Sequence, residues 1–186
     1  MEREIELKIL EVDEAHFEEK ILNLGAVPKG SFFQRRYVYD FNPVDPNKWI
    51  RLRTNGEKTT LTIKEIKDKN AIDGVFELEV EVEDFEKTNM ILNLLGYKAR
   101  NYQENYRKIY LFNNLEISID SWPLIPTYVE IEGKCTSDVL GFLELVKGEG
   151  IETALDVDSI YREIYGIDVK KIENLKFEVN RYERLL

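Results

Sequence analysis

The sequence predicts an α+β domain built on an antiparallel sheet of eight strands. Eight segments alternate apolar and polar residues with a period of two, which is typical of β-strands. Two segments with helical spacing interrupt this series, and more helices follow it. The alternation favours an antiparallel sheet, because the strands of a parallel sheet are usually apolar on both faces.

The first strand sets the pattern for the others. Glu4, Glu6 and Lys8 alternate with apolar neighbours, so one face of this strand is fully charged. Glutamates two positions apart repel each other, and this repulsion needs either bulk water or a bound cation to offset it. Asp13 then caps an amphipathic helix that ends near Gly25.

The remaining elements follow in order along the chain. We expect strands over residues 31–41, 49–53, 60–64, 76–82, 101–111, 115–120 and 127–134. Gly56 marks a hairpin turn between the third and fourth strands, and a second helix covers residues 85–95. Three more helices are expected over 137–146, 158–165 and 168–172, with Ser137, Asp158 and Asp168 as N-caps. Residues 176–186 receive no assignment.

The polar faces of these strands carry ionisable groups in series two residues apart. They are Glu4, Glu6 and Lys8; Arg51 and Arg53; Thr60, Thr62 and Lys64; Glu77, Glu79 and Glu81; Arg107; Glu116, Ser118 and Asp120; and Glu130, Glu132 and Lys134. In an open sheet such faces are simply solvated, which is the ordinary interpretation for any single strand. In a closed barrel with its apolar faces outward under helices, they converge on one lumen. The rows of glutamate favour the lumen, because carboxylates bind divalent cations while Arg and Lys bind phosphate.

Composition limits the function classes. The chain has 186 residues, of which 26 are Lys or Arg and 36 are Asp or Glu, and its net charge of −10 argues against a general nucleic-acid binder. This length suits one domain with a single core. No run of about 18 apolar residues predicts a membrane span. The single cysteine, Cys135, suits a reducing compartment, so we expect a cytoplasmic protein that does not engage a membrane.

Several of these charged positions occur in an order known from one protein family. They are the Glu4-x-Glu6-x-Lys8 strand, the Gln34-x-x-Tyr37 strand ending in Asp40, Arg51 with Arg53, Lys64, the Glu77-x-Glu79-x-Glu81 strand, Arg107 with Tyr110, Asp120, and Glu130 with Glu132. In this ordered set the chain resembles the CYTH family, also called triphosphate tunnel metalloenzymes, over about residues 2–165. The family includes class IV adenylyl cyclases, thiamine triphosphatases and inorganic tripolyphosphatases.

The resemblance implies one domain over residues 1–186, in which an eight-stranded closed tunnel is followed by a helical extension. It also implies that the tunnel binds a small triphosphate, ATP or tripolyphosphate, together with Mg²⁺ or Mn²⁺, as two ions. The implied phosphate-binding residues are Lys8, Arg51, Arg53, Lys64 and Arg107, with Lys134 as a weaker candidate. The implied metal ligands are Glu4, Glu6, Glu130 and Glu132, with Glu79, Glu81 and Asp120 as supporting acids near the metal. Lys8, Arg53, Glu79 and Glu81 are the residues expected to act in catalysis.

One position departs from the family pattern. Many members have a basic residue two positions before the later arginine, whereas this chain has Asn105 before Arg107. Lys108 is adjacent, but in a strand it points to the opposite face. The resemblance therefore implies that one phosphate contact is absent.

Three kinds of function remain open at this point. A metal-dependent enzyme would hydrolyse a triphosphate, or would use the ribose 3′-hydroxyl of ATP to form cyclic AMP and pyrophosphate. A non-catalytic triphosphate-binding module would use the same cations without turnover, and a scaffold with a solvated sheet would do neither. The full pattern looks most like chains grouped with class IV adenylyl cyclases, and a homodimer packed through a tunnel wall is compatible with it.

Overall fold

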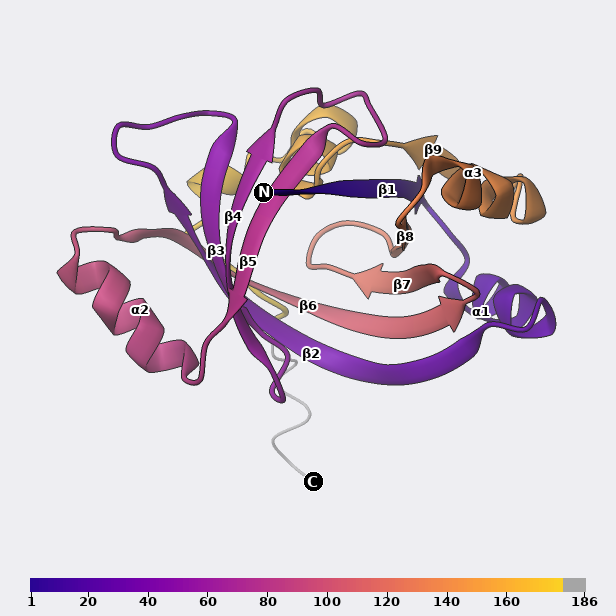
Figure 1. The fold of residues 1–186 in the computed structure, drawn as a ribbon, viewed down its shortest axis with the longest axis horizontal. Coiled ribbons are helices and arrows are strands. Elements are labelled where there is room, and N and C mark those ends of the chain that lie inside the picture. Colours follow the sequence, from indigo (N-terminus) through magenta and orange to yellow (C-terminus); the bar gives the residue numbers. More distant parts are fainter. Residues whose placement is uncertain (179–186) are drawn as a thin grey trace.

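Eight strands close into a ring in the computed structural model, which describes residues 1–178 (Figure 1). The strands are β1 (Glu2–Leu10), β2 (Val27–Asp40), β3 (Lys48–Thr54), β4 (Thr59–Ile66), β5 (Val75–Glu81), β6 (Ala99–Phe112), β7 (Leu115–Ser121) and β8 (Tyr128–Gly133). They pair in the order β6-β2-β3-β4-β5-β1-β8-β7, and β7 pairs with β6 to close the ring. All of these pairings are antiparallel. The predicted α+β class with a closed eight-stranded barrel is confirmed.

The two longest strands form the base of the barrel in the view of Figure 1. β2 and β6 have 14 residues each and pair along most of their length. Register shifts interrupt this pairing between Pro28 and Gly30 and between Val38 and Tyr39. Such irregularities bend a strand and increase its twist, which lets the pair curve around the enclosed space.

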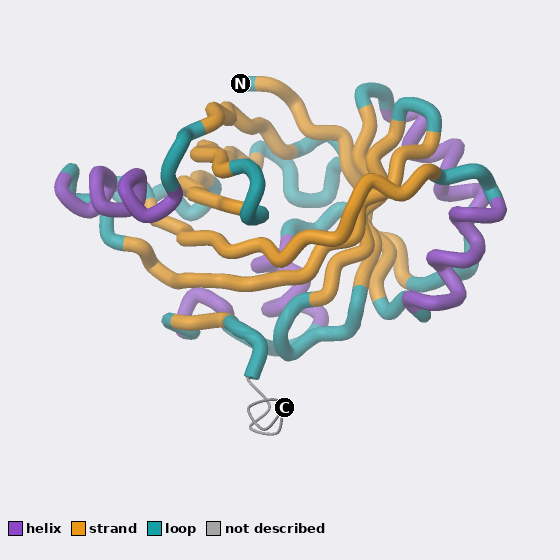
Figure 2. Tube along the Cα trace, turned by 90° about the horizontal axis from the view of Figure 1, so that it is seen from below, coloured by secondary structure: helices purple, strands orange, loops and turns teal. Residues whose placement is uncertain are grey.

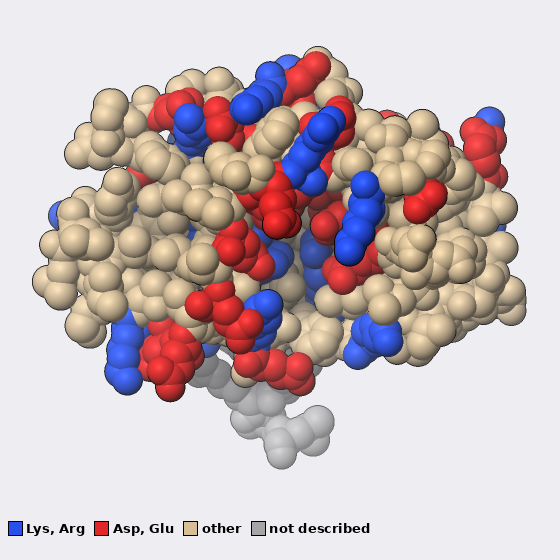
Figure 3. Space-filling model, in the orientation of Figure 1, with Lys and Arg blue, Asp and Glu red and all other residues tan. Residues whose placement is uncertain are grey.

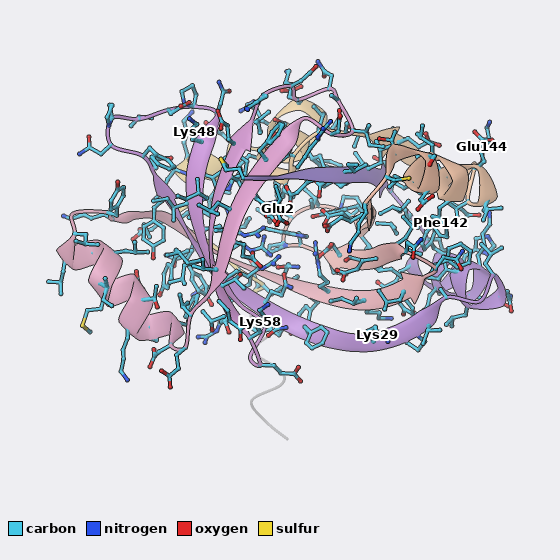
Figure 4. The ribbon with its side chains drawn as sticks, in the orientation of Figure 1. Glu2, Lys29, Lys48, Lys58, Phe142 and Glu144 are labelled. Carbon is cyan, nitrogen blue, oxygen red and sulfur yellow. The ribbon has the colours of Figure 1, made fainter. Side chains whose placement is uncertain are left out.

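The apolar faces of the strands point outward, and helices cover much of them, although Leu78 and Val80 of β5 stay exposed. α1 (Glu14–Asn23) and α3 (Thr136–Leu145) lie at one end of the barrel, and α2 (Phe85–Leu94) lies at the other (Figure 1). Figure 2 shows the helices outside the ring of strands. Phe142 points from α3 toward the sheet, whereas Glu144 points away from it (Figure 4). The lumen interpretation of the charged faces requires this inside-out arrangement.

Two hydrophobic clusters hold the helices on the barrel. Under α1 and α3, the outer faces of β1, β7 and β8 contribute Ile9, Ile117, Ile119, Val129 and Ile131, and the helices contribute Phe17, Ile21, Val139 and Phe142. Under α2, Phe85 and Leu92 pack against Tyr39, Ile50 and Leu52 of β2 and β3. Burying each of these side chains stabilises the fold by about 1.5–3 kcal/mol. The barrel therefore needs no apolar core inside its ring.

The first two helices have acidic N-caps, whereas the third does not. Asp13, as predicted, caps α1 by accepting a hydrogen bond of 3.1 Å from the backbone N–H of His16. Asp84 caps α2 in the same way through the N–H of Lys87. The N-cap of α3 is Cys135, which precedes the expected Ser137 in the sequence, so the prediction of Ser137 was wrong.

The C-terminal part is less regular than the sequence predicts. In place of one α-helix over 158–165, a single turn of α4 (Val157–Ser159) continues as a π-helical turn (Ile160–Ile164). Asp156, not Asp158, is the N-cap, since Asp158 lies within α4 and its carboxylate lies 3.2 Å from the Arg100 guanidinium. Asp168 does cap the next element, a 3-10 helix (Val169–Lys171), through the N–H of Lys170.

Two short strands add to the outside of the ring. β9 (Ile151–Thr153) pairs with β1, and β10 (Asn174–Leu175) pairs in parallel with β6. Both are too short to produce an alternation pattern, which explains why the sequence did not predict them. Of the unassigned segment 176–186, residues 179–186 lie outside the described part of the chain. Within residues 1–178, no helix combines the length and apolar character needed to cross a membrane.

Candidate active site

The barrel encloses a cavity of about 750 Å³ to which all eight strands contribute side chains. This volume lies within the range of pockets that hold small-molecule ligands. Figure 3 shows a hollow near the middle of the molecule, bordered by both acidic and basic side chains. Figure 4 shows the nitrogen and oxygen ends of interior side chains gathered between β1 and β6. The cavity is therefore a charged compartment with both signs of charge inside it.

Lys8 is the most deeply buried cation of the cavity. Its residue is 1% exposed, its Nζ donates a 2.6 Å hydrogen bond to Glu6 Oε1, and it lies 3.5 Å from Glu130 Oε2. Burial acts to lower the pKa of this ammonium, but the charges of Glu6 and Glu130 outweigh burial and raise it. Lys8 is therefore a permanent positive charge at the wall shared by β1 and β8.

Lys64 and Glu4 form a second ion pair, between β4 and β1. Lys64 Nζ lies 2.6 Å from Glu4 Oε1 and 2.7 Å from Glu4 Oε2, and 3.5 Å from Glu77 Oε2. Both oxygens of Glu4 are thus occupied by one ammonium. This contact separates Glu4 from the other predicted metal ligands.

The arginines of β3 face the glutamates of β5. Glu79 Oε2 accepts a 2.7 Å hydrogen bond from Thr62, lies 3.4 Å from Arg51 Nη2 and lies 3.9 Å from Arg53 Nη2. Burial, together with the charges of Arg51 and Arg107, lowers the pKa of Arg53 to about 9. Arg53 still carries its proton at neutral pH. Burial is the main cause of this shift, and the charges of Glu79 and Glu130 oppose it.

Arg107 is held by two carboxylates. It donates from Nε to Asp120 Oδ1 at 3.0 Å and from Nη2 to Asp120 Oδ2 at 2.7 Å, and Nη2 also reaches Glu130 Oε1 at 3.1 Å. Asn105 donates a 2.8 Å hydrogen bond to Asp120 Oδ1. Asp120 is fully buried and does not line the cavity. From this position Asp120 orients Arg107, and the resemblance implies that it is a supporting acid near the metal.

Three carboxylates lie close enough to share a cation. Oxygens of Glu6, Glu130 and Glu132 all lie within 4.8 Å of one another. Burial and the neighbouring charges of Glu130 and Glu6 raise the pKa of Glu132 to about 7, so the cluster carries repulsion that a cation would relieve. Carboxylate oxygens are the ligands that Mg²⁺ and Mn²⁺ prefer. These residues fit a divalent ion, and among residues 1–178 no second group of this kind was found.

The structure brings most of the sequence-predicted site residues together, whereas Asp120, Glu81 and Lys134 are not part of the cavity lining. The cavity lining includes Glu4, Glu6, Lys8, Arg51, Arg53, Lys64, Glu79, Arg107, Glu130 and Glu132. The side chain of Glu81 is 66% exposed and lies 3.2 Å from Lys58, away from the lining. Lys134 follows the last residue of β8 and is exposed. Both residues follow the alternation of their strands, but they lie beyond the part of the strand that faces the cavity.

Arg36 of β2 lines the cavity and was not among the predicted site residues. Position 36 shares a strand face with Gln34 and Asp40, both of which belong to the family pattern. This shared parity is the signal that could have identified Arg36. The adjacent Arg35 and the aromatic residues Tyr37 and Tyr39 obscure it.

Comparison with known proteins gives a match to one family model and several proteins of similar sequence or fold. Residues 2–161 match the family model of the CYTH domain. A candidate adenylate cyclase of Methanocaldococcus jannaschii is 28% identical over 143 residues, which cover 73% of this chain and 79% of the relative. A solved structure of a Pyrococcus horikoshii protein superposes with a TM-score of 0.69 at 25% identity, covering 80% of this chain and 94% of that chain.

A Hippeastrum protein of similar fold carries a more specific description. Its structure matches with a TM-score of 0.60 at 18% identity, over 88% of this chain and 96% of that chain. It is described as an adenylyl cyclase candidate with a dominant triphosphatase activity. At this identity the likeness shows the fold alone.

Proposed function

Because this chain belongs to the CYTH domain family, whose members are adenylyl cyclase-like or triphosphatase metalloenzymes, we propose that it is a metal-dependent enzyme acting on a triphosphate. The observation that carries the proposal is the mixed lining of the cavity. One wall presents Arg51, Arg53 and Arg107, and a carboxylate cluster lies at the wall formed by β1 and β8. A linear polyphosphate with bound cations matches both kinds of charge.

The basic side chains would bind and orient the phosphates. Arg51 and Arg53 project from neighbouring inward positions of β3, Lys64 projects from the adjacent strand β4, and Lys8 projects from β1. Cations that surround the chain of phosphates neutralise its charge and hold the scissile bond in line with the attacking group. They also stabilise the charge that develops on the phosphoryl oxygens in the transition state.

The carboxylates Glu6, Glu130 and Glu132 would hold the divalent ion. When bound there, Mg²⁺ or Mn²⁺ supplies charge neutralisation and Lewis-acid activation. Glu130 also lies 3.1 Å from Arg107 Nη2 and 3.5 Å from Lys8 Nζ. The same residue therefore links the proposed cation site to two proposed phosphate ligands, which would keep the ion and the substrate in a fixed relation.

Two reactions fit this arrangement, and their products distinguish them. Purified protein is incubated with Mg-ATP, Mn-ATP or tripolyphosphate, and the products are separated by chromatography. Cyclic AMP with pyrophosphate supports a class IV adenylyl cyclase. ADP with phosphate, or release of phosphate from tripolyphosphate, supports a triphosphatase. Thiamine triphosphate belongs in the same screen.

A non-catalytic binding module is the second candidate, because the arginine-rich wall would bind a triphosphate whether or not turnover occurs. Calorimetry with tripolyphosphate tests this alternative. Tight binding without turnover in Mg²⁺, Mn²⁺ and Co²⁺ would favour the binding module. If the protein neither binds nor converts any of these triphosphates, the proposed function is wrong.

A further inference from the structure

Arg36 is a buried cation held by neutral groups. Its residue is 6% exposed and lines the cavity. Its Nη2 donates hydrogen bonds to Gln34 Oε1 at 3.0 Å and to Asn105 Oδ1, and its guanidinium lies 4.4 Å from the ring centroid of Trp122. Its Nε is buried and has no hydrogen-bond partner within the described chain. Arg36 is thus oriented in a fixed plane without being neutralised.

No carboxylate of residues 1–178 forms an ion pair with Arg36, although the other cavity cations that we have described each have at least one such partner. Burying a charge is costly unless an opposite charge accompanies it. The nearest cross-strand neighbour on β3 makes the imbalance larger, because Arg36 is paired directly with Arg53 in the sheet register. Like charges in this relation repel each other.

Burial and the neighbouring arginines both disfavour the charge on Arg36. Burial and the charges of Arg53, Arg51 and Arg107 lower the pKa of Arg36 well below its ordinary value. Since an arginine keeps its proton in proteins, the relief must come from an anion rather than from deprotonation. Guanidinium groups form directed, often bidentate hydrogen bonds with phosphate oxygens. A phosphate group is therefore the chemistry that this pair of arginines would recognise.

We propose that Arg36 and Arg53 form a phosphate subsite, in which Arg36 supplies the cation that this chain lacks at position 105. The inference rests on the proposed function and makes it more specific. The cross-strand register of β2 and β6 pairs Gln34 with Asn105, and the side chain of Arg36 reaches the Asn105 amide. The Arg36 guanidinium of β2 thus lies beside position 105, where a basic residue of β6 would place its charge.

Binding of tripolyphosphate without divalent ions tests the subsite, because this measurement leaves the carboxylate cluster out. Calorimetry compares the unaltered protein with Arg36→Gln, Arg53→Gln and the control Arg35→Gln. Arg35 is adjacent in sequence but lies on the outer face, above the ring of Phe85. We expect Arg36→Gln and Arg53→Gln each to weaken binding about 10- to 100-fold, as loss of a charged hydrogen bond does, and Arg35→Gln to leave it unchanged.

A compensating variant makes the test specific. Arg36→Gln combined with Asn105→Arg returns a cation to the same place from β6, so it should recover at least half of the lost binding free energy. A purely structural role for Arg36 predicts lower thermal stability with unchanged affinity for tripolyphosphate. If Arg36→Gln does not fold, Arg36→Lys decides the question, since it keeps the charge and loses the planar fork and should bind several-fold more weakly.

The outcomes separate the two levels of the proposal. Absence of metal-free binding by the unaltered protein would overturn the subsite, whereas the proposed function would fall only if the protein also failed to bind or convert a triphosphate in Mg²⁺ or Mn²⁺. Weaker binding by Arg53→Gln with full affinity in Arg36→Gln would overturn the subsite alone. Equal weakening by Arg35→Gln would also overturn it, because the effect would then come from net charge and not from position.

Discussion

Asp120 accepts two hydrogen bonds from Arg107, from Nε to Oδ1 at 3.0 Å and from Nη2 to Oδ2 at 2.7 Å. The two residues face each other in the register of β6 and β7, the pairing that closes the barrel. Asp120 also accepts the amide of Asn105. A charge pair of this kind fixes the direction of the guanidinium, so Asp120 holds Arg107 in place in the wall proposed to bind phosphate.

Asp120→Asn should therefore weaken the fold and the wall together. The substitution keeps the shape of the side chain but leaves Arg107 with Glu130 as its only charged partner among the described residues. We expect the free energy of unfolding to fall by about 3 kcal/mol, because a buried pair loses one of its charges. Urea unfolding measures this change. Glu152→Gln, at an exposed position of β9, serves as the control and should have almost no effect.

Removal of a carboxylate from the cluster of Glu6, Glu130 and Glu132 should weaken binding of the divalent ion. Glu130→Gln and Glu132→Gln each remove a charged oxygen ligand from the group that lies within 4.8 Å. We expect the concentration of Mg²⁺ or Mn²⁺ needed for half-maximal activity to rise about tenfold or more. Glu81→Gln should leave the metal dependence unchanged, since Glu81 lies outside the cavity. Full activity of both variants at ordinary Mg²⁺ would contradict the ligand assignment.

Lys108→Ala should have little effect on the site. Lys108 follows Arg107, but its Nζ points outward and lies 3.0 Å from Glu14 and 2.7 Å from Glu18 of α1. We expect unchanged affinity for triphosphate and a loss of stability below about 1 kcal/mol, because the pair is partly exposed. Calorimetry and thermal unfolding measure the two effects. A large loss of affinity would mean that the alternation of β6 is displaced by one residue.

The contact between α1 and β6 should also make stability depend on acid pH. Hydrogen bonds from Lys108 and Tyr110 lower the pKa of Glu18 below its ordinary value of 4.5. A carboxyl group with a lowered pKa in the folded state contributes stability that is fully present above the unfolded pKa and is lost as the pH falls through the folded one. We expect the stability difference between the unaltered protein and Glu18→Gln to shrink below about pH 4.5. A difference that stays constant from pH 7 to pH 3 would contradict this assignment.

The alternation of charged residues predicted which side chains share a strand face and favoured a lumen, whereas the closed eight-stranded barrel and the roles of its lining residues came from the family resemblance. Glu4, Glu6 and Lys8 share a face because a strand repeats every two residues, and the same rule separates Arg107 from Lys108. The period gives the face of a residue but not its depth along the barrel. Glu81 was therefore expected at the site, although it lies at the end of β5 in contact with solvent.

Contacts that depend on register between distant strands could not be predicted from one strand at a time. The absence of a basic residue at position 105 was visible in the sequence, but the nearby Arg36 belongs to a strand about 70 positions earlier. The engagement of both Glu4 oxygens by Lys64 likewise depends on the pairing that places β1 and β4 on either side of β5. At the C-terminus, the contact of Asp158 with Arg100 competes with the local capping preference that the sequence suggested.

The order of the strands in the ring has a consequence for how the chain reaches its native state. β1 contains Glu6 and Lys8, yet one of its neighbours is β8, so Glu6 is paired with Glu132 and Lys8 with Glu130 across most of the chain length. Contacts between residues so far apart in sequence carry a high entropic cost of loop closure and slow the search for the native topology. The cluster of Glu6, Glu130 and Glu132 can form only once the first strand has docked beside the last strand of the ring. Recovery of divalent-ion binding during refolding should therefore report the completion of the barrel.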